Sequence, residues 1–397
     1  MSWKRVPTVV IRTLAAGTVL LVAAACGSDK HTPLGPDTGS VQVSTATTGH
    51  NLDADGYSIS VDGGQAQSVG DTASITLDGV TAGSHAITLS GLAPNCSVAN
   101  ATQTVTVTAG ASATVSFQVT CAQQLAFESS SSGISDIWVV DQDGTGLTPL
   151  LSDTTNNEVP VWSPDGSKIL FLRLANGNAD VYVMDANGGN LKRLTSDTAQ
   201  DGVATWSPDG TKIAFTSTRA GHAQIFVMNA DGSSVTQLTH MTPPSGESGP
   251  DSVALTSYPA WSPDGTTIAF QSRQTGSFNI WSIDAAGKTA PKQLTTGTDD
   301  QHPSWSGDSK TILYDSKQGA HREIFKMNAD GSSQTAITSG STVDNAGPVY
   351  SPDGTTIAFF ATGTQSEQLF LVDADGQNRR QVHSNPGQIQ ARPSWRP

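Results

Sequence analysis

Histidine and aspartate residues in the second half of the sequence are the side chains best suited to chemistry, because imidazole and carboxylate groups carry protons and bind divalent metals. They lie in separate repeats without the close spacing of a metal-binding motif: His222, His240, His302, His321, His383, Asp299 and Asp300. The sequence contains neither Gly-x-Ser-x-Gly nor His-Glu-x-x-His, and no glycine-rich phosphate loop precedes a helix. We therefore expect no enzymatic activity, no resident metal and no cofactor. A metal site formed by these histidines is the alternative.

The scaffold that positions these residues is a repeated phrase of the form Trp-Ser-Pro-Asp-Gly. Its aromatic residues recur at intervals of 44, 55, 44, 45 and 45 residues. A fixed period of this length indicates an array of structural repeats. The copies begin at Trp162, Trp206, Trp261, Trp305 and Tyr350, and Trp395 ends a truncated sixth copy.

Each period contains the parts of one four-stranded propeller blade. A short Pro-x-Trp strand leads through the Ser-Pro-Asp-Gly turn to a second strand such as 212–215, a third such as 224–228 and a fourth near 237–239. The second strand occurs six times, beginning with 124–127, whereas the first blade lacks its own inner strand. We expect 391–395 to supply it, so that the C-terminal strand closes a six-bladed ring.

The repeated aromatic and acidic residues have structural interpretations. We expect the tryptophans to pack between neighbouring blades. We expect the aspartates to bind turn backbone, namely Asp165, Asp209, Asp264, Asp308 and Asp353. The fourth copy has Gly307 and Ser309 in place of proline and glycine, which indicates a diverged repeat and not a site.

The repeated phrase resembles the TolB-type propeller repeat over residues 124–395. The resemblance implies an all-β, six-bladed propeller. The chain differs from TolB in the domain that precedes its propeller and in its predicted lipid anchor, so TolB's own role in the envelope is not transferred intact. Propeller-shaped oligogalacturonate lyases, which use histidine-bound metal, are the resemblance behind the metal alternative.

Residues 1–26 read as an export signal. Lys4, Arg5 and Arg12 precede an apolar stretch that ends in small residues before Cys26, and this stretch is too short for a permanent membrane helix. The pattern resembles a bacterial lipoprotein signal, which implies lipidation of Cys26; an ordinary cleaved signal is the alternative. Residues 27–38 are predicted to be a flexible tether. We expect anchoring to the outer membrane, facing the periplasm or the cell exterior.

A net charge of −14 argues against nucleic-acid binding.

Residues 39–121 are predicted to form a small β-sandwich. Alternating strands are expected at 41–45, 57–61, 73–77, 85–89, 104–107 and 114–119, with turns at Asp62-Gly63-Gly64 and Asp78-Gly79. The stretch 83–89 resembles PEGA-type sandwich modules, and we expect His85 in it to pack or to cap a turn. If Cys26 is acylated, Cys96 and Cys121 remain to form a disulfide in an oxidising compartment.

Binding is expected on the side of the ring that carries the longer connections, because variable loops on a rigid scaffold commonly bind ligands. The candidates, chosen by loop position, are Arg219, His222, Arg273, Phe278, His302, Lys317, His321 and Arg322. A protein or peptide of the cell envelope is the expected partner. A glycan ligand, with Tyr258 and Phe278 as candidate aromatics, and a purely structural role are the alternatives.

The connection 240–257 is either a partial cap over the channel or a neutral insertion. Carboxylates of the channel, Glu158, Asp201, Asp300 and Asp344, could also hold a cation.

Overall fold

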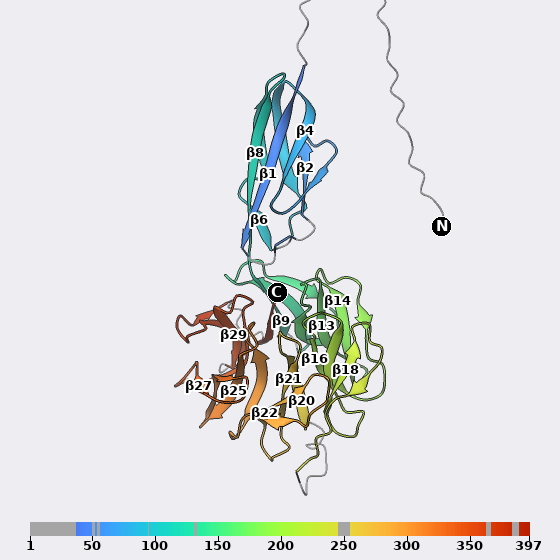
Figure 1. Cartoon of the computed structure of the whole chain (residues 1–397), viewed down its shortest axis with the longest axis vertical. Coiled ribbons are helices and arrows are strands. Elements are labelled where there is room, and N and C mark those ends of the chain that lie inside the picture. Colours follow the sequence, from blue (N-terminus) through green and yellow to red (C-terminus); the bar gives the residue numbers. More distant parts are fainter. Residues whose placement is uncertain are drawn as a thin grey trace, which may run out of the picture.

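The computed structural model describes residues 37–49, 52–53, 56–93, 95–130, 133–244, 255–362, 367–382 and 389–397. These residues form strands and turns arranged as two bodies, an elongated sandwich and a ring of six sheets (Figure 1). The predicted all-β class is confirmed. Some predicted features lie outside the described residues, namely the signal, Cys26, the tether up to residue 36 and His383. Within the described part of the chain, no helix has the length and apolarity needed to cross a membrane.

The sandwich consists of two four-stranded sheets with the orders β4-β1-β8-β6 and β3-β2-β5-β7. Alternating side chains of both sheets meet in one core that includes Val43, Ile59, Leu89 and Phe117. The strands are β1 (Thr38–Gly49), β2 (Tyr57–Val61), β3 (Gln67–Val69), β4 (Ser74–Thr81), β5 (Gly83–Ser90), β6 (Cys96–Val98), β7 (Thr102–Val107) and β8 (Ser112–Cys121).

Two details of the sandwich differ from the sequence-based expectation. The edge strands β3 and β6 were not predicted, because three residues are too few to show an alternating pattern. The predicted turn at Asp78-Gly79 is wrong, since both residues lie inside β4. Gly79, with φ of 72°, is the extra residue at a register shift against β1, where it bends the strand instead of reversing it.

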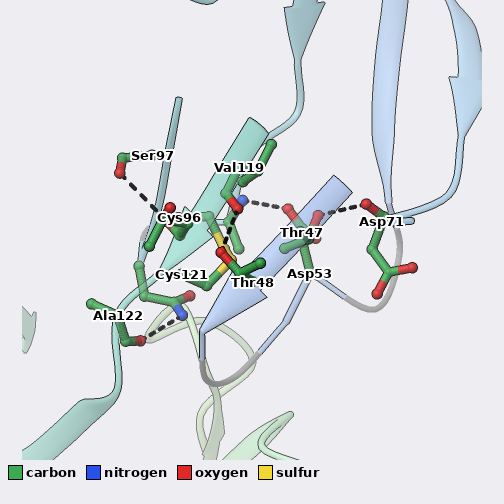
Figure 2. The surroundings of a disulfide bond; sticks show 12 residues. Thr47, Thr48, Asp53, Asp71, Cys96, Ser97, Val119, Cys121 and Ala122 are labelled. Carbon is green, nitrogen blue, oxygen red and sulfur yellow. Dashed lines mark hydrogen bonds between the residues drawn. A yellow bond between two sulfur atoms is a disulfide. The ribbon is translucent and has the colours of Figure 1, made fainter. Parts of the chain in front are cut away.

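The predicted roles of His85 and of the two cysteines are confirmed. His85 caps a turn: its Nδ1 lies 2.7 Å from Asp62 Oδ2 and its Nε2 lies 2.8 Å from the Thr81 carbonyl oxygen. Cys96 and Cys121 form a disulfide between β6 and the end of β8 (Figure 2). This bond lies at the end of the sandwich where the chain continues through Ala122 into the ring.

The ring consists of six four-stranded blades, and the predicted closure is confirmed. Strand β32 pairs antiparallel with β9 as the inner strand of blade one, with Trp395 opposite Leu125. The first three blades, from the inner strand outward, are β32 (Ile389–Trp395), β9 (Gln124–Ser130), β10 (Ser135–Asp141), β11 (Thr148–Leu151); β12 (Asn156–Trp162), β13 (Lys168–Ala175), β14 (Asn178–Asp185), β15 (Lys192–Arg193); and β16 (Asp201–Trp206), β17 (Lys212–Ser217), β18 (Gln224–Asn229), β19 (Thr236–Gln237).

The remaining three blades follow the same order. They are β20 (Thr256–Trp261), β21 (Thr267–Ser272), β22 (Asn279–Asp284), β23 (Lys292–Gln293); β24 (Asp300–Trp305), β25 (Thr311–Gln318), β26 (His321–Asn328), β27 (Thr335–Ala336); and β28 (Asp344–Tyr350), β29 (Thr356–Thr362), β30 (Glu367–Asp373), β31 (Arg380–Gln381).

The propeller has its cores between blades. Each of six buried clusters among the described residues joins two neighbouring blades. The final aromatic residue of every inner strand packs into one of them, as predicted for Trp162 and Trp206. Trp305 Nε1 also donates to the Ala260 carbonyl oxygen of the preceding blade at 3.0 Å. These aromatic residues therefore join each blade to the one before it.

The aspartates of the repeated turns bind backbone, as predicted. In blade three, Ser207 Oγ and Thr211 N both donate to Asp209 Oδ1, at 2.6 and 3.0 Å. These bonds, the one from Ser207 foremost, lower the pKa of Asp209. The same pattern recurs at Asp165, Asp264, Asp308 and Asp353. These tight turns therefore have nearly the same hydrogen bonds in five of the six blades.

Candidate functional site

The inner strands share an unusual backbone feature. Each shows a register shift against its second strand a few residues before the final aromatic residue. In five blades the residue at this bulge has a positive φ and precedes a proline: Val159, Tyr258, His302, Gly347 and Arg392. Such a conformation costs about 1–3 kcal/mol for a residue other than glycine. Blade three has Val203-Ala204 there, without a positive φ.

At three of these bulges, the backbone N–H group donates a hydrogen bond to a side chain of the preceding blade. Val159 N donates to Glu128 Oε2 at 2.9 Å, and His302 N donates to Gln271 Oε1 at 2.9 Å. Gly347 N donates to Asp315 Oδ1 at 3.0 Å. All three acceptors lie on second strands, so polar bonds connect neighbouring blades close to the channel.

Three bulge side chains meet in the middle of the ring, and we call Tyr258, His302 and Arg392 the channel bridge. Arg392 comes from blade one and Tyr258 from blade four, which are opposite each other in a ring of six. Arg392 Nη1 donates to the Tyr258 hydroxyl and lies 3.3 Å from His302 Nε2. The Tyr258 and His302 rings meet edge-on with centroids 4.4 Å apart. The bridge therefore spans the channel.

An ion-pair chain orients His302. Its Nδ1 lies 2.7 Å from Asp315 Oδ1, and Arg322 Nη1 lies 2.5 Å from Asp315 Oδ2. Burial alone would raise the pKa of Asp315, but His302 and Arg322 beside it hold that pKa below its usual range. The ionised Asp315 therefore accepts a hydrogen bond from the Nδ1–H of His302, and in that tautomer Nε2 is the acceptor that faces Arg392 Nη1.

Glu128 lies behind the bridge on β9. Burial raises the pKa of Glu128 to about 7, against the opposing effects of Arg392 and of the Val159 N–H, while Glu158 and Glu367 add to the rise. Its Oε1 is 3.9 Å from Arg392 Nε. Burial also raises the pKa of Glu367. The charge on this side of the bridge therefore changes near neutral pH.

A pocket of about 180 Å³ lies on the tight-turn side of the bridge. Tyr258, His302 and Arg392 line one end, and the residues that follow them toward the final aromatic line the walls. The walls are mainly apolar: Pro160, Val161, Val203, Ala204, Pro259, Ala260, Pro303, Pro348, Val349 and Pro393. The channel is thus a pocket with a polar end.

The structure corrects the placement of His302, which was predicted on a loop. It lies within β24, where its side chain is 13% exposed and belongs to the bridge. The extended Asp300–Trp305 segment pairs with β25 as an inner strand, because the connection that precedes it is shorter than predicted.

Two predicted arginines are engaged in ion pairs and are not presented to solvent as free charges. Arg219 Nη2 lies 2.8 Å from Asp197 Oδ2 and 3.0 Å from the buried Asp201 Oδ2. Arg322 pairs with Asp299 and Asp315 and is 14% exposed. Both are expected to stabilise their blades.

Three other predicted residues gather on the loop face, the side opposite the tight turns. Arg273, Phe278 and Lys317 line a groove of about 630 Å³ between blades four and five, together with Gly276, Ser277, Thr298, Asp299 and Gly319. Away from this groove, His321 Nδ1 lies 3.4 Å from Asp344 Oδ1. His222 is half-buried, and its Nδ1 has no hydrogen-bond partner among the described residues.

The described residues contain no group of three or more His, Cys, Asp or Glu side chains placed to hold a metal ion. Of the four carboxylates considered for a cation, none lines the channel pocket. Asp201 instead accepts from Arg219, and Asp344 accepts from Arg322 N.

Arg392 of the channel bridge, and the supporting residues Glu128, Gln271 and Asp315, were not predicted from the sequence. A signal was present: alignment of the six repeats on their final aromatic residue places Val, Val, Tyr, His, Gly and Arg at one position, five of them before proline. Large polar residues at a position that is otherwise small or aliphatic indicate a specialised site.

Comparison with known proteins supports the fold. A family profile described as the TolB beta propeller domain matches residues 103–257 and 250–397. The structure of TolB from Acinetobacter baumannii is 23% identical with a TM-score of 0.61, covering 69% of this chain and 67% of that one. A TolB-type protein of Agrobacterium tumefaciens is 19% identical with a TM-score of 0.53, covering 69% and 99%. The nidogen/laminin complex contains a chain that is 9% identical with a TM-score of 0.57, covering 69% and 98%. Comparison with curated proteins gives no match.

Proposed function

The chain belongs to the TolB beta-propeller family, and from this premise we propose that it is a non-enzymatic binding protein of the bacterial envelope. Lipidation of Cys26 anchors it to the outer membrane, and the PEGA-like sandwich separates the propeller from the lipid. The loop face binds a protein or peptide partner.

The groove on the loop face is the observation that carries this proposal. The chain has a net charge of −14, yet Arg273 and Lys317 line the same groove as Phe278. The groove's carboxylate, Asp299, is already paired with Arg322. A cationic groove with an aromatic residue is typical of a protein-binding surface, where arginine and aromatic residues are enriched.

The connection between the two domains supports the same orientation. The chain leaves the sandwich at Cys121 and enters β9 at Gln124, at the tight-turn end of blade one. Arg396 Nη1 also lies 3.2 Å from Asn95 Oδ1 of the sandwich. The lipid-proximal domain is therefore joined at the tight-turn face, and the loop face is directed away from this junction.

The test is affinity capture with the soluble chain from Gly27 onward against envelope extract of its own organism, read by mass spectrometry. Arg273→Glu/Lys317→Glu should lose the captured protein because it reverses the charge of the groove. Lys288→Glu/Lys310→Glu makes the same charge change on the tight-turn face and should retain it. Equal capture by the wild type and both double variants would reject the groove as the partner-binding site. Capture of glycan alone would favour carbohydrate binding.

The anchor is tested separately. Cells expressing the full chain are labelled with a palmitate analogue, and Cys26→Ser should lose both the label and recovery in the outer-membrane fraction. Persistent labelling of Cys26→Ser would reject lipidation at this residue.

A further inference from the structure

The channel pocket has one polar end, and its donors are only partly used. Among the described residues, the hydrogen bonds of Arg392 involve Nη1, although a guanidinium carries five N–H donors. Its Nε is 3.9 Å from Glu128 Oε1, beyond hydrogen-bond distance. The Tyr258 hydroxyl accepts from Arg392, so its own proton is available to an acceptor. The end of the pocket therefore presents donors and positive charge.

The walls of the pocket favour an apolar ligand body of limited size. Proline, valine and alanine side chains surround the space between the bridge and the tight-turn face. An apolar cavity of about 150 Å³ holds one benzene molecule, so a pocket of about 180 Å³ takes a single ring or a short branched chain. Charged hydrogen bonds are strong in such surroundings because little water competes for them.

The three residues of the channel bridge have strained backbone conformations. Tyr258, His302 and Arg392 have φ of 55°, 52° and 57°, each before a proline. Blade three shows that an inner strand of this propeller can form without a positive φ at its bulge. Backbone strain of this kind persists where the surrounding structure enforces it, and it gathers at binding and active sites.

We propose that the channel pocket is a binding site for a small monocarboxylate with an apolar body. The carboxylate binds Arg392 and the Tyr258 hydroxyl, and the apolar body lies along the proline-lined walls. Asp315 holds His302, which in turn supports Arg392. This site is distinct from the loop-face groove, and its ligand does not depend on the partner proposed there.

The test is calorimetric titration of the soluble chain with benzoate and isovalerate, with benzyl alcohol as the uncharged comparison. Benzoate should bind more tightly than benzyl alcohol. Tyr258→Phe should lower the affinity for benzoate about tenfold, as expected for loss of one hydrogen bond to a charged group. Ala260→Phe fills the pocket from its wall and should abolish binding. Tyr182→Phe, which removes a hydroxyl outside the pocket, should change nothing.

A pH series provides a second measurement. The groups that face Glu128 are Arg392 from β32, Glu158 and the Val159 N–H from β12, and Glu367 from β30. Ionised Glu128 competes for Arg392, so benzoate binding should tighten as pH falls from 8 to 6. Glu128→Gln should reduce this dependence. Equal affinity for benzoate and benzyl alcohol, no binding of either acid at millimolar concentration, or unchanged binding by Ala260→Phe would each overturn the proposal.

Discussion

The sandwich and the propeller hold their ends together by different chemistry. In the sandwich, a covalent bond joins β6 to the end of β8 through Cys96 and Cys121. In the propeller, β32 adds to β9 by backbone hydrogen bonds, with buried Ala391 and Trp395. The two closures adjoin, because β8 and β9 are separated by only two residues.

The difference follows from how each body builds its core. The sandwich has one cluster of buried side chains, and small domains of this kind gain much from a cross-link. The propeller distributes its burial over six interfaces between blades, so no single interface carries its stability. Its weak point is the seam of blade one, which no covalent bond secures. If the two closures are independent, loss of one should leave the stability of the other body unchanged.

Removal of the closing strand is expected to have the largest effect. A chain ending at residue 388 exposes Leu125 and Phe127 and leaves the β9 edge unpaired, so the propeller should lose its cooperative thermal transition while the sandwich keeps its own. Scanning calorimetry measures both transitions. A peptide of residues 389–397 added in trans should restore the propeller transition, and an unchanged transition in the truncated chain would contradict the closure.

Loss of the disulfide should affect the other body. Cys96→Ala/Cys121→Ala opens a loop of 25 residues, which lowers the free energy of unfolding of the sandwich by about 3.5 kcal/mol in the chain-entropy model. The propeller transition should not move. Urea unfolding followed separately in each domain measures the effect, and a matching loss in the propeller would show that the closures are coupled.

Glu128 should make the stability of the seam depend on pH. Its folded pKa of about 7 lies above the ordinary value for glutamate, so the folded state binds the proton more tightly. The stabilisation from this group is fully present below about pH 4.5 and is lost as pH rises through the folded pKa of about 7, and it amounts to about 3 kcal/mol in total. Glu128→Gln should flatten the profile measured by urea unfolding; a profile identical to wild type would contradict this assignment.

His85 is expected to have the smallest effect, in the sandwich. Hydrogen bonds to Asp62 and to the Thr81 carbonyl oxygen raise the pKa of His85 above 6.5. The stabilisation is fully present below pH 6.5 and is lost as pH rises through the folded pKa. Melting of the sandwich from pH 5 to 9 should show this loss, and His85→Gln should remove it. NMR titration of the imidazole measures its pKa directly, and a value below 6.5 would contradict this prediction by reversing the sign of the pH dependence.

The sequence predicted the parts of the fold that repeat. Trp206 and Asp209 recur with the same neighbours in other copies, so their packing and turn roles could be inferred from period alone. The channel bridge could not be inferred in this way. Tyr258 and Arg392 are 134 residues apart and come from opposite blades, so their contact has no local signature. Arg219 and Arg322 were expected on the surface because their loops are polar, but their ion pairs with Asp201 and Asp315 form only after neighbouring strands are paired.

The closing strand also sets an order of events during synthesis. Strand β9 is made near the start of the propeller and its partner β32 at the end, so blade one stays incomplete while the other five blades are translated. Until then β9 presents an open strand edge, which is a site for pairing with other chains. A chain in this state would gain from being kept unfolded, or bound by a chaperone, until its last residues have been synthesised.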